Sequence, residues 1–103
     1  MKTRTPAEAL SAHVEGQGRL VALAHEKLTA AAVVLDDARC DLHHYLSAHL
    51  RQGVAPDAGE VARLTSACDV ALTQWHRLHA RYDEEARRYS RLAERAEAAR
   101  GEL

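Results

Sequence analysis

Residues 53–57 read Gly53-Val54-Ala55-Pro56-Asp57, and this short stretch lies between two long helical patterns. Gly53 suits the left-handed backbone conformation that ends many helices, and Val54 can fold back on the last helical turn. Pro56 disfavours helix at the residue before it. The stretch therefore predicts a turn that ends one helix and starts another.

Capping signals stand at the start of both predicted helices. Asp57 predicts an N-cap, and Glu60 at the third helical position completes a capping box. Thr5 and Glu8 have the same spacing near the start of the chain, with a proline between them at the first helical position. We expect a helix over about 6–51, a turn over about 52–57 and a helix over about 58–100.

Apolar residues recur every seven positions in both predicted helices. The first helix has a row of small residues at Ala24, Ala31 and Ala38, whereas the second has Trp75 and Tyr82. Small residues facing large ones at a 3.5-residue period predict two antiparallel helices packed along one seam. Reflection about residue 54 places Trp75 near Ala31. The residues expected to hold this seam are Leu28, Leu35, Trp75, Leu78 and Tyr82.

The pattern predicts an all-α fold, a long antiparallel helical hairpin of coiled-coil type that forms a single domain over residues 1–103. Gly16 and Gly18 interrupt the first helix, and each costs roughly 1 kcal/mol relative to alanine. Two alternatives are open at this point. The helix bends there, or a short leading helix of residues 6–15 hinges on the glycine pair.

A second, less regular apolar surface lies off the seam. Two thin helices bury less apolar surface than a compact globule, and water disfavours the exposure of such a patch. We expect the hairpin to pair with a second copy as a four-helix bundle, or to dock on another helical protein. Its predicted role is that of an adaptor, a chaperone-like binder or an inhibitor. The expected interaction residues are Leu20, Leu23, Val34, Leu46 and Leu72.

Polar residues interrupt the seam at Gln17, His49 and Glu85. Such residues can fix register and partner choice at some cost in stability. Alternatively, they mark places where the two helices splay apart.

Seven histidines in 103 residues raise a rival, metal-binding hypothesis. Cys40 with His43 or His44 has helical i, i+3 and i, i+4 spacing, which suits zinc, copper or nickel. No paired Cys-x-x-Cys motif supports it. The competing interpretation is a solvated polar face with no cofactor. Cys40 is expected to face outward and Cys68 to lie in the seam, which disfavours a disulfide.

The charge balance disfavours nucleic acid as a partner. The net charge is −1, with 14 basic and 15 acidic residues interspersed. Arg87, Arg91 and Arg95 share one helix face, but acidic residues alternate with them and reduce the positive potential that phosphates require. An RNA- or DNA-binding hairpin dimer is therefore only a further alternative.

Several other classes are disfavoured by missing sequence features. No apolar run approaches the ~20 residues that span a bilayer. A secretory signal has an uninterrupted apolar segment after its basic start, and no such segment follows the basic stretch Met1–Arg4. With two cysteines, a reduced cytoplasmic setting is expected. We expect no enzyme, because no phosphate loop or nucleophile motif occurs and the adjacent acids Asp36 and Asp37 point about 100° apart on a helix.

Overall fold

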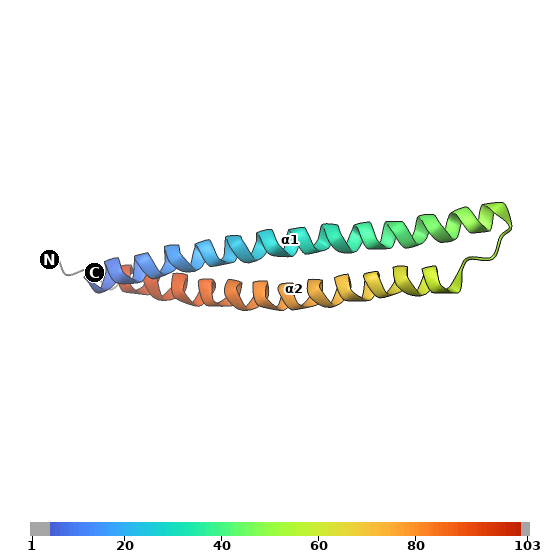
Figure 1. The fold of residues 1–103 in the computed structure, drawn as a ribbon. Coiled ribbons are helices and arrows are strands. Elements are labelled where there is room, and N and C mark those ends of the chain that lie inside the picture. The colour runs from blue at the N-terminus through green and yellow to red at the C-terminus, as the bar shows by residue number, and fades with distance from the viewer. Residues whose placement is uncertain (1–4, 102–103) are drawn as a thin grey trace. The chain divides into compact units, whose positions relative to one another are not determined.

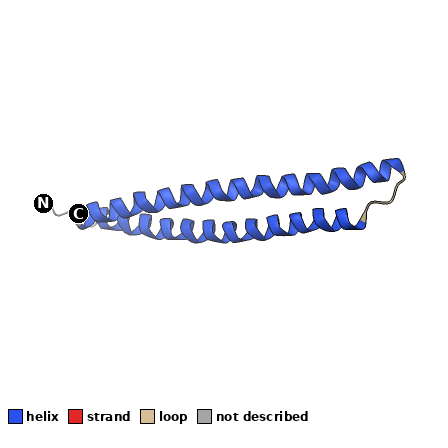
Figure 2. Ribbon diagram, in the orientation of Figure 1, coloured by secondary structure: helices blue, strands red, loops and turns tan. Residues whose placement is uncertain are grey.

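The computed structural model describes residues 5–101, so Met1–Arg4 and residues 102–103 lie outside the described part. Two α-helices, α1 (Pro6–Gln52) and α2 (Ala58–Gly101), make up almost all of it (Figure 1). No strand occurs among the described residues (Figure 2). The predicted all-α antiparallel hairpin is confirmed, and each predicted helix ends one residue short of the observed end.

The hairpin divides into two compact units. The terminal unit comprises Met1–Lys27 and His79–Leu103, and the turn unit comprises Leu28–Leu78. In each unit a segment of α1 packs antiparallel against a segment of α2. The single domain over residues 1–103 stays a prediction.

In the turn unit, α1 ends in a Schellman motif. Gly53 has a φ of 66°, and its N–H donates to the carbonyl oxygen of Leu50 at 3.2 Å. The N–H of Val54 donates to the carbonyl oxygen of His49 at 3.1 Å. This pair of hydrogen bonds satisfies carbonyls that the helix end would leave without partners, and the positive φ favours glycine. The predicted C-cap is confirmed.

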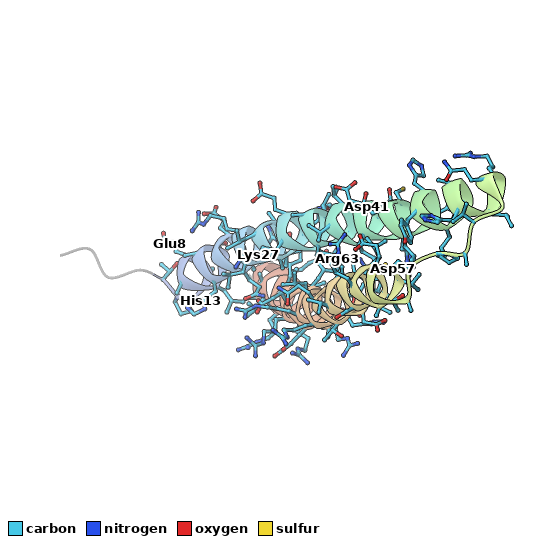
Figure 3. All side chains as sticks on the ribbon, turned by 45° about the vertical axis from the view of Figure 1, so that its right-hand side comes forward. Glu8, His13, Lys27, Asp41, Asp57 and Arg63 are labelled. Carbon is cyan, nitrogen blue, oxygen red and sulfur yellow. The ribbon has the colours of Figure 1, made fainter. Side chains whose placement is uncertain are left out.

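The start of α2 differs from its prediction in one respect. Asp57 is the N-cap, because its Oδ2 accepts from the N–H of Glu60 at 2.9 Å. The Glu60 carboxylate does not accept a hydrogen bond from the N–H of Asp57, so the reciprocal half of the predicted second capping box was wrong. It accepts instead from the guanidinium of Arg63, one turn further on (Asp57 and Arg63 are labelled in Figure 3). The hydroxyl of Tyr45 takes the place of Glu60 and accepts from the N–H of Asp57 at 2.9 Å.

Glu60 and Arg63 influence each other's ionisation. The hydrogen bond from Arg63 lowers the pKa of the Glu60 carboxyl below its ordinary value. That hydrogen bond, with a smaller contribution from Asp41 on α1, raises the pKa of the Arg63 guanidinium. Both ions are therefore held in their charged forms at neutral pH.

In the terminal unit, α1 begins with the predicted capping box. The N–H of Glu8 donates to Thr5 Oγ1, and the N–H of Thr5 donates to the Glu8 carboxylate, both at 3.2 Å. The helix then runs unbroken through Gly16 and Gly18, so the alternative of a separate leading helix was wrong. A Cβ at Gly18 would lie 3.3 Å from the Tyr89 ring, whereas one at Gly16 would meet nothing within 4 Å. Gly18 thus gives room for a close approach of Tyr89.

The residues buried between the helices are mostly small. The buried apolar residues all lie on the seven-residue repeats, and they are Ala24, Ala31, Leu35, Leu64, Ala71 and Ala96. Leu28, Trp75, Leu78 and Tyr82 are half-buried. Among the described residues, no large side chain is fully buried. Each unit therefore has a narrow core with much apolar surface at its edges.

Candidate association surface

Large apolar side chains are exposed in both units. In the terminal unit Leu20 and Leu23 are each nearly half exposed, at 47% and 46%. In the turn unit the exposed fraction reaches 84% at Leu50. Of the predicted interaction residues, Leu20, Leu23, Val34 and Leu46 are exposed, while Leu72 is half-buried. The other large apolar residues that are exposed are Val33, Val54, Val70 and Tyr89.

The predicted interaction residues of the turn unit do not share one face. Val34 and Leu46 are twelve residues apart on α1, which at 3.6 residues per turn sets them roughly 120° apart around the helix. Leu46 lies instead on a row with Ala32 and Arg39, because these three residues are spaced by seven. Val34 therefore belongs to a different side of α1 from Leu46.

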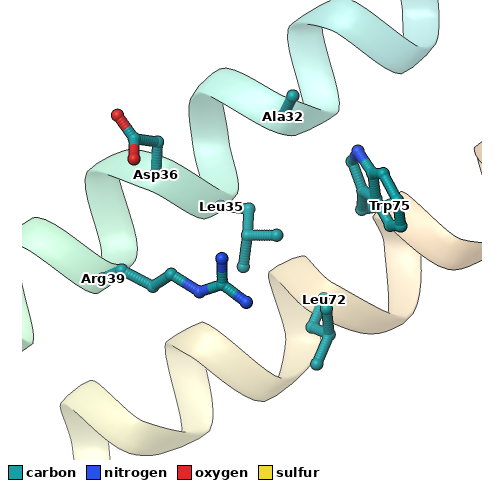
Figure 4. A pocket seen from close by; sticks show the side chains of 6 residues that line it. All are labelled: Ala32, Leu35, Asp36, Arg39, Leu72 and Trp75. Atoms are coloured by element: carbon teal, nitrogen blue, oxygen red, sulfur yellow. The ribbon is translucent and has the colours of Figure 1, made fainter.

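A pocket of about 300 Å³ opens in the turn unit (Figure 4). Leu35, Leu72 and the half-buried indole of Trp75 supply its apolar surface. The Arg39 side chain extends from α1 toward α2 at one end of the pocket, and the Asp36 carboxylate points away from α2 (Figure 4). Ala32 completes the lining. We call this pocket, with its six lining residues, the Trp75 groove.

Sequence reasoning missed Ala32, Asp36 and Arg39 as parts of an apolar groove. The signal was present as a second row of residues at alternating spacings of four and three on α1. This spacing is that of a coiled-coil seam, and such a row keeps to one side of a helix. The row runs through Ala32, Asp36, Arg39, His43, Leu46 and Leu50. We call it the second stripe of α1.

The terminal unit has a smaller hollow of about 30 Å³ beside its exposed leucines. Leu20 and Leu23 line it together with two basic residues, Lys27 and Arg81, and with Glu85. A hollow of this size has room for about one water molecule or one methyl group. The exposed leucines themselves, rather than the hollow, make this part of the surface apolar.

A polar pair lies in the core of the terminal unit. Gln17 and Glu85 are only 9% and 8% exposed. The Nε2 of Gln17 donates to the backbone oxygen of Glu85 at 3.0 Å and also to its carboxylate. Arg88 approaches the same carboxylate at 3.9 Å. The alternative of helices that splay apart was therefore wrong for these two residues.

The third polar seam residue, His49, lies in the last turns of α1 in the turn unit. It is half-buried, and its Nδ1 lies 2.9 Å from the backbone oxygen of Tyr45. Its ring packs on the Tyr45 ring with centroids 4.3 Å apart. His49 thus helps to hold the tyrosine that contacts Asp57.

The metal candidates Cys40, His43 and His44 are all exposed on α1. The centroids of the two imidazole rings are 6.2 Å apart, and His43 Nε2 lies 3.5 Å from the hydroxyl of Ser47. Among the described residues, no three His, Cys, Asp or Glu side chains converge as a metal site requires. The structure therefore does not bring these three candidates together.

The two cysteines are free thiols in different environments. Cys40 is exposed, and Cys68 is half-buried on α2. This arrangement agrees with the outward and seam positions that the heptad pattern predicts for them.

The arginines of α2 are interleaved with acids, as the sequence indicates. Arg88 donates to the Glu84 carboxylate at 2.8 Å. Arg87 and Arg91 are exposed on either side of Ser90, with Asp83 lining the same shallow surface. Phosphate binding needs an excess of positive charge, and acidic neighbours reduce it here.

Comparison with models of known protein families, with curated proteins and with solved structures finds no match to this chain. In the described residues, neither helix has a stretch apolar enough and long enough to cross a membrane. The exposed apolar side chains and the Trp75 groove are the features of the described surface that point to binding.

Proposed function

We propose that this protein is a noncatalytic protein–protein interaction module that associates through apolar helix faces. Its partner is a second copy of the chain or another helical protein. The exposure of large aliphatic side chains on both units supports this proposal, because removal of apolar surface from water is the main favourable term in most protein–protein association. The protein would act in the cytoplasm as an adaptor, a chaperone-like binder or an inhibitor, since each of these roles uses such a surface.

The observation that carries the proposal is the exposure of large apolar side chains in each unit. Leu20 and Leu23 are 47% and 46% exposed in the terminal unit, and Val34 and Leu50 are 58% and 84% exposed in the turn unit. Burial of these side chains in an interface would remove apolar area from water, which favours association. Packing as a four-helix bundle would provide this cover, because each helix then packs against more than one neighbour.

Sedimentation equilibrium over a wide range of protein concentration tests the proposal. We expect the wild type to associate, and a variant with serine at Leu20, Leu23, Val34 and Leu46 to remain monomeric. Circular dichroism should show equal helix content in both, because these positions are exposed. In parallel, photo-crosslinking from position 23 in the native cells should trap a second copy or another helical protein.

Two results would contradict the proposed function. The first is a wild type that stays monomeric at every concentration and forms no crosslinked species in cells. The second is association that is equally strong in the serine variant, because the exposed leucines and valine would then play no part in it.

A further inference from the structure

We propose that a second copy of this chain docks on the Trp75 groove about a two-fold axis, with Asp36 of each copy facing Arg39 of the other. This inference rests on the proposed function and adds the identity of the partner and the place where it binds.

The groove offers an apolar centre for an interface. Leu35 lies at its base with only 7% exposure, and Leu72 and Trp75 stand half-buried beside it. Ala32 is small, so a helix laid over the groove can approach the α1 backbone closely. Aromatic residues at the centre of a patch commonly provide much of the binding energy.

The two charges at the groove complement each other. Asp36 and Arg39 are both exposed, and neither has an ion-pair partner among the residues that the structure describes. A two-fold interface presents the same patch from both copies, so a residue i that meets residue j is matched by j meeting i. When two α1 helices pair antiparallel, Asp36 of the first copy faces Arg39 of the second. Arg39 of the first copy then faces Asp36 of the second, so two attractive contacts form.

The second stripe of α1 provides the matching helix face. Its spacings of four and three residues are those of a coiled-coil seam, with Ala32 and Leu46 at either side of the charged pair. In an antiparallel pair that sets Asp36 against Arg39, Ala32 lies opposite His43 of the second copy, and Leu46, which is 39% exposed, lies opposite Thr29 of the second copy. Antiparallel packing of two such stripes would place four helices together, which is the arrangement that covers the narrow cores.

A second copy explains the charge pattern more economically than another partner does. A foreign acidic helix would be attracted by Arg39 but repelled by Asp36, and a basic helix would meet the reverse. The same chain, turned by 180°, meets both charges with the opposite sign. We therefore name the second copy as the occupant and treat other occupants as outcomes of the test.

The test uses charge reversal and mixing with the full chain. We prepare Asp36→Arg and Arg39→Asp, each with a different mass label, and measure association by sedimentation and native mass spectrometry. Each variant alone should dimerise at least about tenfold more weakly than the wild type, since two attractions become two repulsions. An equimolar mixture should form a heterodimer about as strong as the wild-type dimer, because both contacts are then attractive again.

Matched controls separate this effect from a change in net charge. Asp37→Arg and Arg77→Asp make the same charge changes at exposed positions outside the groove, and both should dimerise like the wild type. Circular dichroism of each variant checks that the helices are retained. The double variant Asp36→Arg/Arg39→Asp should recover the wild-type dimer.

Three outcomes would overturn the inference. They are a mixture that remains monomeric, control variants that are weakened as much as the groove variants, and a wild type that shows no dimer at all. If the wild type dimerises but mixing restores nothing, the inference fails and the proposed function stands. If the wild type is monomeric yet crosslinks to a foreign helical protein in cells, another partner occupies the groove and only the inference fails.

Discussion

The hydroxyl oxygen of Tyr45 accepts a hydrogen bond of 2.9 Å from the backbone N–H of Asp57, twelve residues further along the chain. This contact joins the last turns of α1 to the N-cap of α2 within the turn unit. It supplies a partner to an N–H that the Glu60 carboxylate leaves unbound, because that carboxylate is held by Arg63. The turn is thus held by a side chain that precedes it by two helical turns.

Replacement of Tyr45 by phenylalanine should therefore destabilise the turn unit. We expect a loss of roughly 0.5–1.5 kcal/mol in the free energy of unfolding, the usual net contribution of one hydrogen bond. Urea denaturation followed by circular dichroism measures it. Tyr89→Phe removes a hydroxyl from the exposed Tyr89 in the terminal unit and serves as the control. Equal stabilities of the two variants would show that the Tyr45 hydroxyl contributes nothing.

The buried pair in the terminal unit predicts strong non-additivity. Gln17→Leu removes the donor to the Glu85 carboxylate, and the buried charge left behind should cost about 1–3 kcal/mol. Gln17→Leu/Glu85→Leu replaces both partners by apolar groups and should be close to the wild type in stability or above it. A double-mutant cycle from urea denaturation measures the coupling. Additive losses would mean that the two side chains do not act as a pair.

The two glycines of α1 provide a matched comparison. Gly16→Ala meets no neighbouring atom within 4 Å, so it should stabilise the protein by up to ~1 kcal/mol through the higher helix propensity of alanine. Gly18→Ala places its Cβ 3.3 Å from the Tyr89 ring, so the ring must move and the gain should be smaller or reversed. Thermal denaturation of both variants measures their changes in stability relative to the wild type. A larger gain at position 18 would contradict the observed packing.

The ion pair at the start of α2 predicts a shifted titration. Because the Arg63 hydrogen bond lowers the pKa of Glu60, the pair contributes stability above the ordinary pKa of about 4.3. That contribution is lost as the pH falls through the lower pKa of the folded state. Carboxyl-carbon NMR should show Glu60 titrating below its ordinary value in the wild type. In Arg63→Gln its pKa should return toward that value, and an unchanged pKa would exclude Arg63 as the cause.

The turn and the caps could be predicted from the sequence because they depend on a few neighbouring residues. Gly53 and Asp57 have their predicted roles, since a positive φ and an N-cap are local requirements. The reciprocal bond of Glu60 could not be predicted in the same way. Arg63 competes for that carboxylate, and Tyr45 reaches the freed N–H from a position twelve residues earlier.

Contacts along the seam were harder to predict, because they depend on side-chain length as well as on register. Reflection about residue 54 placed Trp75 near Ala31, and Trp75 does line one pocket with the neighbouring Ala32. The same reflection puts Gln17 opposite residue 91, yet its amide reaches Glu85. A long side chain bonds diagonally across the seam, and the heptad pattern does not encode that direction.

The Trp75 groove could not be located from the sequence for a related reason. Two rows flank the seam of α1, one containing Val34 and one containing Arg39, and the heptad pattern treats both alike. Which flank opens as a pocket depends on the side chains that the facing helix brings to it, here Leu72 and Trp75. The exposure of Leu20, Leu23 and Leu46, by contrast, followed from their positions off the repeat, whereas Leu72, which is also off the repeat, is half-buried.

A core built around alanines, in which no large side chain of the described residues is fully buried, has a consequence for the protein in a cell. If self-association covers the remaining apolar surface, dimerisation contributes to the folding equilibrium by mass action. The melting temperature should then rise with protein concentration. A cell that makes few copies would hold them nearer to unfolding, and proteolysis would remove the unpaired chains first.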